Sequence, residues 1–91
     1  MKSIWKYALP IDDQAGIEMQ EGAEILHIDA QGDQPMIWAL VDPGAKQTVR
    51  RFRTFGTGHP LPEDTSDLRH VGTWLIRGGA LVFHTFEKVA A

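Results

Sequence analysis

The feature that most constrains the fold is the C-terminal segment His70–Glu87, which predicts a β-hairpin with two apolar faces. Two runs rich in Val, Ile, Leu, Trp, Phe and Thr flank Gly78 and Gly79, a pair that suits two-residue hairpin turns. Side chains alternate between the faces of a strand. One face then carries Trp74, Ile76, Leu81 and Phe83, and the other carries Val71, Leu75, Val82 and Phe86. The pattern does not select which face is the core.

The same register pairs residues across the two strands of this hairpin. It places His70 opposite Glu87, where we expect a surface charge pair worth a few tenths of a kcal/mol. It places Thr73 opposite His84, where we expect an ordinary hydrogen bond. His70 and His84 fall on opposite faces, so the hairpin alone is not expected to bring them to one metal ion.

The remainder of the chain consists of short β-prone runs separated by Gly, Pro and Asp. The candidate strands are Lys2–Leu9, Gly16–Gln20, Glu24–Gln31, Met36–Asp42, Gln47–Phe55, His70–Arg77 and Ala80–Glu87. The turn at Asp42-Pro43-Gly44 predicts a second tight hairpin and a meander over much of the chain. We therefore expect one all-β domain over residues 1–91, with about seven mostly antiparallel strands in a small barrel or compact sandwich.

Composition excludes several classes of protein. The 91 residues contain no cysteine, which rules out disulfides, thiolate nucleophiles and Cys-based metal centres. The net charge of −3 gives no global attraction to nucleic acid or anionic lipid. No segment approaches the roughly 20 apolar residues of a transmembrane helix, and the N-terminus lacks a signal-peptide pattern. We expect a soluble intracellular protein that makes no contact with membranes.

The amount of apolar β-surface predicts a protein partner. The run Met36–Val41, like the terminal hairpin, is apolar on both faces, whereas one face of a sandwich strand is normally solvated. A chain of this size has little left to cover the excess, so we expect a homo-oligomer or a complex with another protein. The expected interaction face is Trp74, Ile76, Leu81 and Phe83, with the opposite hairpin face as the alternative.

A nucleic-acid-binding β-barrel is the first alternative. Lys46, Arg50, Arg51 and Arg53 form a basic run in which Arg51 and Arg53 share one strand face and Phe52 lies on the other. Such a strand could follow a phosphate backbone. Basic residues also protect exposed strands from unwanted pairing, and on a net negative chain we favour that interpretation.

A metal- or small-ligand-binding domain is the second alternative, centred on the loop with Gly56, Gly58 and His59. The two glycines allow positive φ and an anion-holding arrangement of backbone N–H groups, although the loop lacks the residues of a phosphate-binding P-loop. The histidines show no metal-ligand spacing, so we predict no metal site and no cofactor. No nucleophile or paired acid–base signature is present, and we predict no enzyme activity.

Several segments resemble a family of small uncharacterised proteins encoded by bacteriophages and prophages. The resemblance runs in order along nearly the whole chain, through Ile4–Tyr7, Ala23–Leu26, Trp38–Asp42, Phe55–Pro60 and Leu81–Glu87. It implies a phage-related protein located in the cytoplasm of a bacterial host or in a phage particle. It assigns no catalytic or binding residue, and it favours an interaction module over an enzyme.

Overall fold

The computed structural model describes residues 1–89, which form seven β-strands and a short 3₁₀ turn. The strands are β1 (Ser3–Ala8), β2 (Gln14–Gln20), β3 (Glu24–Gln31), β4 (Gln34–Val41), β5 (Gln47–Gly56), β6 (Leu68–Ile76) and β7 (Leu81–Lys88), with η1 (Arg77–Gly79) between the last two. In this part of the chain no helix has the length and apolar character needed to cross a bilayer. The all-β prediction is confirmed.

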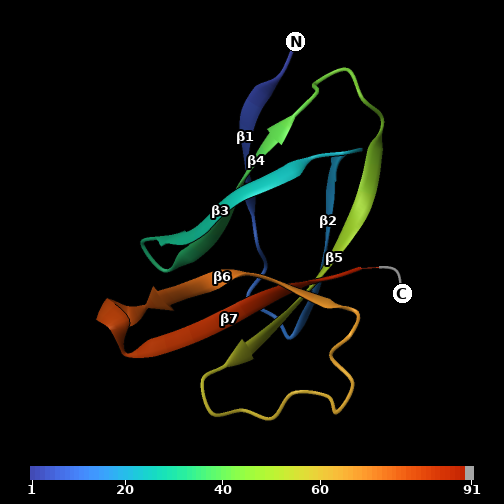
Figure 1. Cartoon of the computed structure of the whole chain (residues 1–91). Helices are drawn as coiled ribbons and strands as arrows, with labels where there is room; N and C mark the ends of the chain where they lie inside the picture. Colours follow the sequence, from blue (N-terminus) through green and yellow to red (C-terminus); the bar gives the residue numbers. More distant parts are fainter. Residues whose placement is uncertain (90–91) are drawn as a thin grey trace.

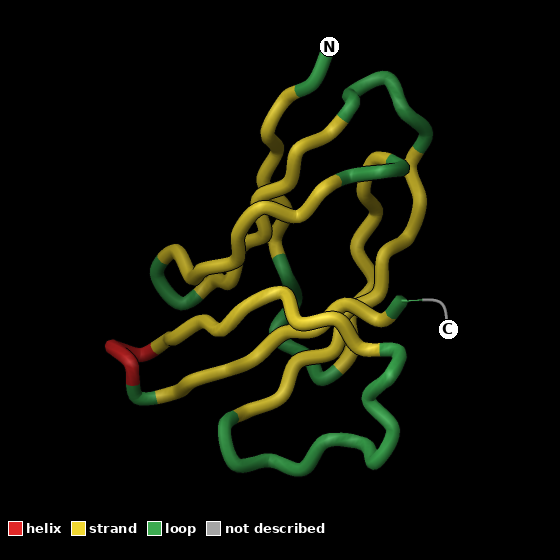
Figure 2. The backbone as a smooth tube through the Cα atoms, viewed as in Figure 1, coloured by secondary structure: helices red, strands yellow, loops and turns green. Residues whose placement is uncertain are grey.

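The strands form two antiparallel sheets (Figures 1 and 2). One has three strands in the order β1-β4-β3, and the other has four in the order β2-β5-β7-β6. Within residues 1–89 the sheets do not close into a barrel, so the architecture is a sandwich. Edge strands β3 and β6 pack against each other where the sheets meet.

Chain connectivity differs from the predicted meander. Adjacent strands form hairpins at β3–β4 and β6–β7, whereas the turn after β4 carries the chain into the other sheet. Within that turn, Ala45 N donates a hydrogen bond to Asp42 O at 3.0 Å. It is attached to the end of β2, because the Gln20 amide donates to Ala45 O at 2.9 Å and Glu21 N donates to Lys46 O at 2.8 Å. The turn is therefore stabilised by β2, and the predicted hairpin at Asp42-Pro43-Gly44 is wrong.

The core lies between the inward faces of the two sheets. Its largest fully buried side chains include Trp74, Phe52, Leu9, Met19, Ile37 and Val41. The Trp74 ring stacks on Phe83 with centroids 4.8 Å apart, and its Nε1–H donates to Thr85 Oγ1 at 2.9 Å. Thr85 Oγ1 also lies 2.9 Å from Thr54 Oγ1. These hydrogen bonds satisfy polar atoms that burial would otherwise leave without a partner.

The terminal hairpin keeps the predicted register near its turn. Ala80 N donates to Arg77 O, and Gly78 and Gly79 have φ angles of 65° and 92°, as a type I′ turn requires. The predicted pairing holds from Ile76 opposite Leu81 to Gly72 opposite Thr85.

Beyond Gly72 a β-bulge shifts the hairpin register by one residue. Val71 is left unpaired, so His70 faces Phe86 and Arg69 faces Glu87. The predicted His70–Glu87 pair is therefore wrong. The extra residue shifts the part of β6 that precedes it in the sequence, so those side chains point to the opposite face from the predicted one. His70 consequently shares a sheet face with His84, contrary to the prediction. The Thr73–His84 hydrogen bond is confirmed at 2.8 Å.

The bulge adjoins a close approach between the two sheets at Gly72. A Cβ built on Gly72 would lie 2.4 Å from Ile28 Cγ2, which is far inside van der Waals contact. We expect Gly72→Ala to lower the free energy of unfolding by about 1–3 kcal/mol, as overpacking does. Gly44→Ala is the control, because its Cβ would meet only Asp42 Oδ1 at 3.6 Å. Urea denaturation of both variants measures the difference, and equal stabilities would contradict the packing argument.

Candidate functional site

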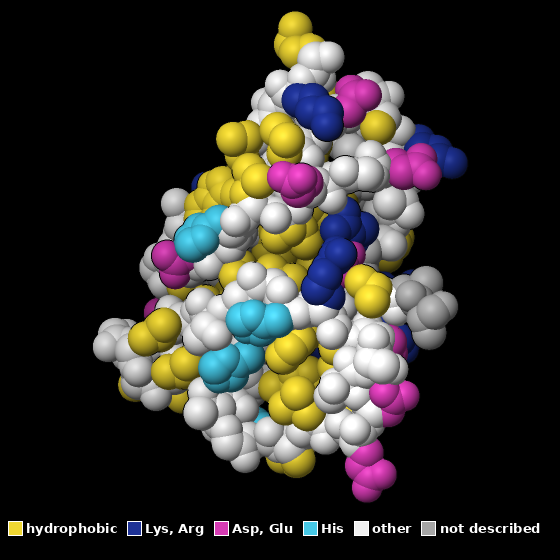
Figure 3. Space-filling model, viewed as in Figure 1, with side chains coloured by type: hydrophobic (Ala, Val, Ile, Leu, Met, Phe, Trp, Pro, Cys, Tyr) yellow, Lys and Arg dark blue, Asp and Glu magenta, His cyan; other side chains and the backbone are white. Residues whose placement is uncertain are grey.

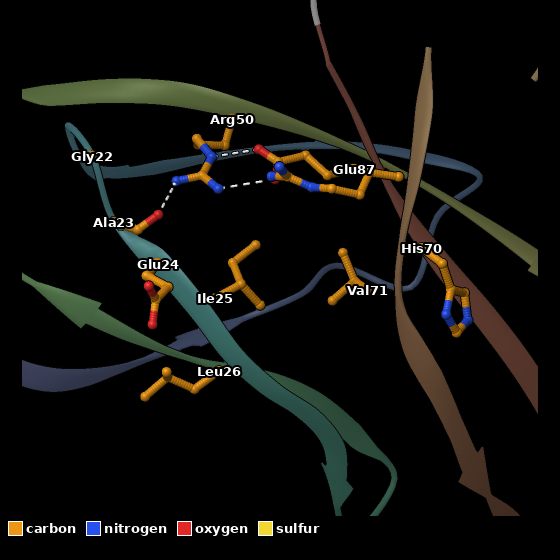
Figure 4. Close-up of a pocket in the computed structure, with 10 residues that line it drawn as sticks. Gly22, Ala23, Glu24, Ile25, Leu26, Arg50, His70, Val71 and Glu87 are labelled. Atoms are coloured by element: carbon orange, nitrogen blue, oxygen red, sulfur yellow. Dashed lines mark hydrogen bonds and ion pairs between the residues drawn. The ribbon is translucent and has the colours of Figure 1, made fainter. Parts of the chain in front are cut away.

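A cleft of about 460 Å³ opens where β3 of one sheet faces β6 of the other. Ile25 and Val71 project toward one another from these two strands, while Glu24 and Leu26 project from the other side of β3 (Figure 4). Arg50 and Glu87 border the same space from the four-stranded sheet. The cleft therefore combines an apolar surface with a charged wall.

The charged wall is a buried ion cluster centred on Glu87, whose exposed fraction is only 4%. Arg50 donates to both carboxylate oxygens of Glu87 through Nε and Nη2 (Figure 4), and Arg69 Nη2 donates to Glu87 Oε1 at 2.8 Å. Arg50 Nη1 also donates to Ala23 O at 2.7 Å. This geometry ties β5, β6 and β7 to the chain just before β3.

The cluster fixes the ionisation of its members. Burial alone would raise the pKa of Glu87, but hydrogen bonds from Arg50 and Arg69 and their positive charges outweigh it, so the pKa lies below its usual range. The hydrogen bond to Glu87 raises the pKa of Arg50, against the opposing effect of burial. At neutral pH, Glu87 is therefore an anchored carboxylate and is unsuited to proton transfer. The ion cluster works as a structural joint with one surplus positive charge, which Glu24 balances within the cleft.

The structure places the predicted interaction face inside the sandwich. Trp74 is fully buried, Ile76 is 7% exposed, and Phe83 packs against the core. Leu81 is 39% exposed at the hairpin end. As a docking surface this face is a wrong prediction for Trp74 and Ile76, because the three-stranded sheet already covers them. The alternative face is outward at Leu75, Val82 and Phe86, whereas the bulge turns Val71 toward the core.

The Gly56–His59 loop is a compact turn. Gly58 has a φ of 87°, as predicted, but Gly56 ends β5 without a positive φ. Its missing side chain instead leaves room for the His59 ring, which lies 3.0 Å from the position of a Cβ there. Thr57 N donates to Val82 O and His59 N donates to Gly56 O, so these two N–H groups already have acceptors. They do not form the anion-holding arrangement that the sequence allows.

The basic run is divided among three locations. Arg51 and Arg53 lie on the outward face of β5, Arg50 points inward to Glu87, and Lys46 sits in the β4–β5 turn, 3.7 Å from Glu21. Arg50 lies two residues from the buried Phe52, so the two side chains share the inward face of β5. Arg50 is therefore not part of a nucleic-acid surface. On the same outward face, pairing brings Lys88 opposite Arg51 and Phe86 opposite Arg53. Sequence reasoning did not connect these residues, because they lie more than thirty positions apart.

A second apolar surface lies on the outward side of the three-stranded sheet. We define the outer apolar face by the residues Ile4, Leu26, Met36, Trp38 and Leu40. Ile4 is 58% exposed and Leu26 46% exposed, and the other three are half-buried. Hydrophobic side chains are visible over β1, β3 and β4 in the upper left of Figure 3. The prediction that Met36–Val41 is apolar on both faces anticipated part of this surface, while Ile4 and Leu26 were not identified.

Residues 1–89 contain no group of three or more His, Asp or Glu side chains that could hold a metal ion. A search of curated proteins and a search of solved structures gave no significant match. A family model described as a domain of unknown function (DUF7352) matches residues 1–91. The chain therefore belongs to the DUF7352 family.

Proposed function

We propose that this protein is a non-enzymatic interaction module that self-associates through its outer apolar face. The observation that carries the proposal is the exposure of Ile4 and Leu26 on either side of the half-buried Met36, Trp38 and Leu40. Contiguous apolar patches are uncommon on monomeric surfaces and are typical of interfaces. Removing this surface from water provides the driving force for association.

Charge on the same sheet favours a second copy as the partner. Three cross-strand rows face outward, namely Ile4–Leu40–Glu24, Lys6–Trp38–His27 and Ala8–Met36–Asp29. A two-fold axis parallel to β4 stacks the central residues of these rows on their own copies. It also places Lys6 over the partner's β3, between the partner's Glu24 and Asp29. The surface is thus self-complementary, as an isologous dimer requires.

The expected result is a dimer with twice the 10.2 kDa chain mass in light scattering coupled to size-exclusion chromatography. Ile4→Glu and Leu26→Lys should each raise the dimer dissociation constant at least tenfold. The two-fold axis places residue 4 over the partner's Glu24 and residue 26 near the partner's Lys6, so each variant replaces an apolar contact worth about 1.5–3 kcal/mol with a like-charge contact. Both positions are exposed in the protomer, so the melting temperature extrapolated to low concentration should change little.

Leu61→Lys is the matched control, since Leu61 is 43% exposed but lies in the loop between β5 and β6. It should leave the dimer intact. A wild-type protein that remains monomeric at high micromolar concentration would overturn the proposal. So would a loss of dimer caused equally by Leu61→Lys.

We further propose a phage or prophage setting, in the cytoplasm of a bacterial host or in a phage particle. Support comes from the segments Ile4–Tyr7 and Phe55–Pro60, among others, that resemble proteins from those genomes. Neighbouring genes of phage assembly or lysogeny would support this setting, and a purely housekeeping neighbourhood would contradict it.

A further inference from the structure

We infer that the outward face of the four-stranded sheet binds single-stranded nucleic acid, independently of self-association. The two surfaces belong to different sheets. Three basic and several aromatic side chains meet on this face from three neighbouring strands. The inference rests on their arrangement along neighbouring strands, on a small basic pocket and on the aromatic side chains beside it.

Two neighbouring cross-strand pairs of β5 and β7, Arg51–Lys88 and Arg53–Phe86, carry the positive charge. Arg51 of β5 lies directly opposite Lys88 of β7, and Arg53 follows two residues along β5 on the same face. Arg51 lies over β2 where Gly16 has no side chain, with Nη1 3.4 Å from the position that a Cβ would take. The absence of a side chain at Gly16 therefore leaves the Arg51 guanidinium group accessible above the sheet.

The three cations share a pocket of about 150 Å³. Its lining residues are Gln14, Ala15, Gly16, Arg51, Phe52, Arg53 and Lys88, with no carboxylate among them. Arg51 and Lys88 also border a neighbouring hollow of about 440 Å³, whose lining includes the paired Arg50 and Glu87. Asp67 lies 3.9 Å from Lys88 Nζ, in an exposed pair of little energetic value, and Asp13 borders a separate hollow together with Arg53.

Arg53 is the most enclosed of the three cations. Its Nε is buried and has no hydrogen-bond partner among residues 1–89. The guanidinium group lies over the Phe55 ring at 5.1 Å, which holds it in place. Because this Nε atom is buried, contact with a phosphate group falls to the exposed Arg51 and Lys88 side chains of the same pocket.

An aromatic row continues from the basic pocket and favours nucleic acid over a simple anion. Phe86 packs edge-on against Phe55 at 5.9 Å and against His70 at 5.1 Å. His70 is exposed and Phe86 is half-buried, so bases attached to a bound backbone meet π-faces on β6 and β7. In Figure 3, histidine and hydrophobic side chains lie together over these strands, in the lower half of the view. Single-strand-binding surfaces combine such stacking groups with a basic track.

The experiment measures fluorescence anisotropy of labelled 12-mers of dT and U across a salt series. Three phosphate contacts predict a slope of log affinity against log salt of about −2. Arg51→Gln and Lys88→Gln should each reduce the slope by about 0.7. Lys46→Gln is the matched control, since it removes the same charge from the turn outside this face. His70→Ala and Phe86→Leu should weaken oligonucleotide binding about fivefold or more by removing stacking.

Three results would overturn the inference. The first is the absence of salt-dependent binding at low salt, and the second is a loss with Lys46→Gln equal to that with Arg51→Gln. The third is equal competition by inorganic polyphosphate together with no effect of His70→Ala, which would identify a general polyanion site. Ile4→Glu and Leu26→Lys lie on the other sheet. Both variants should bind oligonucleotides as the wild type does even where they lose the dimer, which separates this inference from the proposed self-association.

Discussion

Glu87→Gln is expected to lower the free energy of unfolding by about 3–5 kcal/mol, because it leaves the buried Arg50 guanidinium group without its counter-charge. The glutamine keeps the shape of the side chain, so the loss reports charge rather than a cavity. A 91-residue domain has about 5–14 kcal/mol in total. The variant should therefore unfold at a markedly lower urea concentration and melt more than about 10 °C below the wild type.

The pH dependence of the same variant gives an independent measurement. The pKa of Glu87 is lower in the folded than in the unfolded protein, so its stabilising effect is fully present above the unfolded value of about 4.3. It is lost as the pH falls through the folded pKa. The stability difference between wild type and Glu87→Gln should be largest near pH 6–7 and shrink below about pH 4.

Glu18→Gln is the control for this pair of measurements, because it replaces a carboxylate with an amide at an exposed position of β2. We expect it to alter stability by less than about 0.5 kcal/mol. A Glu87→Gln protein as stable as the Glu18→Gln protein would show that the ion cluster does not hold the sandwich together.

Trp74→Ala is the second large effect, with an expected loss of about 3–5 kcal/mol in the free energy of unfolding. The substitution empties a fully buried site, removes the ring stacked on Phe83, and deprives Thr85 of its hydrogen bond from Nε1. Leu81→Ala is the matched control from the same hairpin face. Leu81 is 39% exposed, so its truncation should cost about 1 kcal/mol or less.

Urea denaturation and light scattering together distinguish a core role for Trp74 from an interface role. A core residue changes stability in the monomer at low concentration. If Trp74→Ala left monomer stability unchanged but abolished self-association, the face predicted from the sequence would be the interface after all.

Strand composition and turn residues predicted most of the fold. The Gly78-Gly79 turn set the pairing of the terminal hairpin correctly as far as Gly72, because turn geometry fixes the register near the loop. The bulge at Val71 was not predicted, because it lies farther from the turn than the pairs whose register the turn fixes. The glycine at position 72 was a signal for it, since a glycine within a strand often marks a bulge or a close approach of another chain segment.

Long-range pairing explains why the candidate sites were harder to predict. The prediction grouped Arg50 with the other cations of the basic run, although strand parity puts it on the same face as Phe52. Its partner Glu87 is 37 positions away in the sequence. Likewise, Trp74 and Trp38 both lie in strands that are apolar on two faces, so the sequence alone does not tell which of the two is in the core. Only the sheet order places Trp74 inside and Trp38 on the outer apolar face.

The bulges in β3 and β6 have a consequence for how the molecule can grow by strand addition. Leu26 and Val71 each interrupt the hydrogen-bonding pattern of an edge strand, and an interrupted edge is a poor template for another chain. The other two edges, β1 and β2, pair in register along their whole length and present regular backbone donors and acceptors. Domain swapping or fibril formation by this protein would therefore start from β1 or β2.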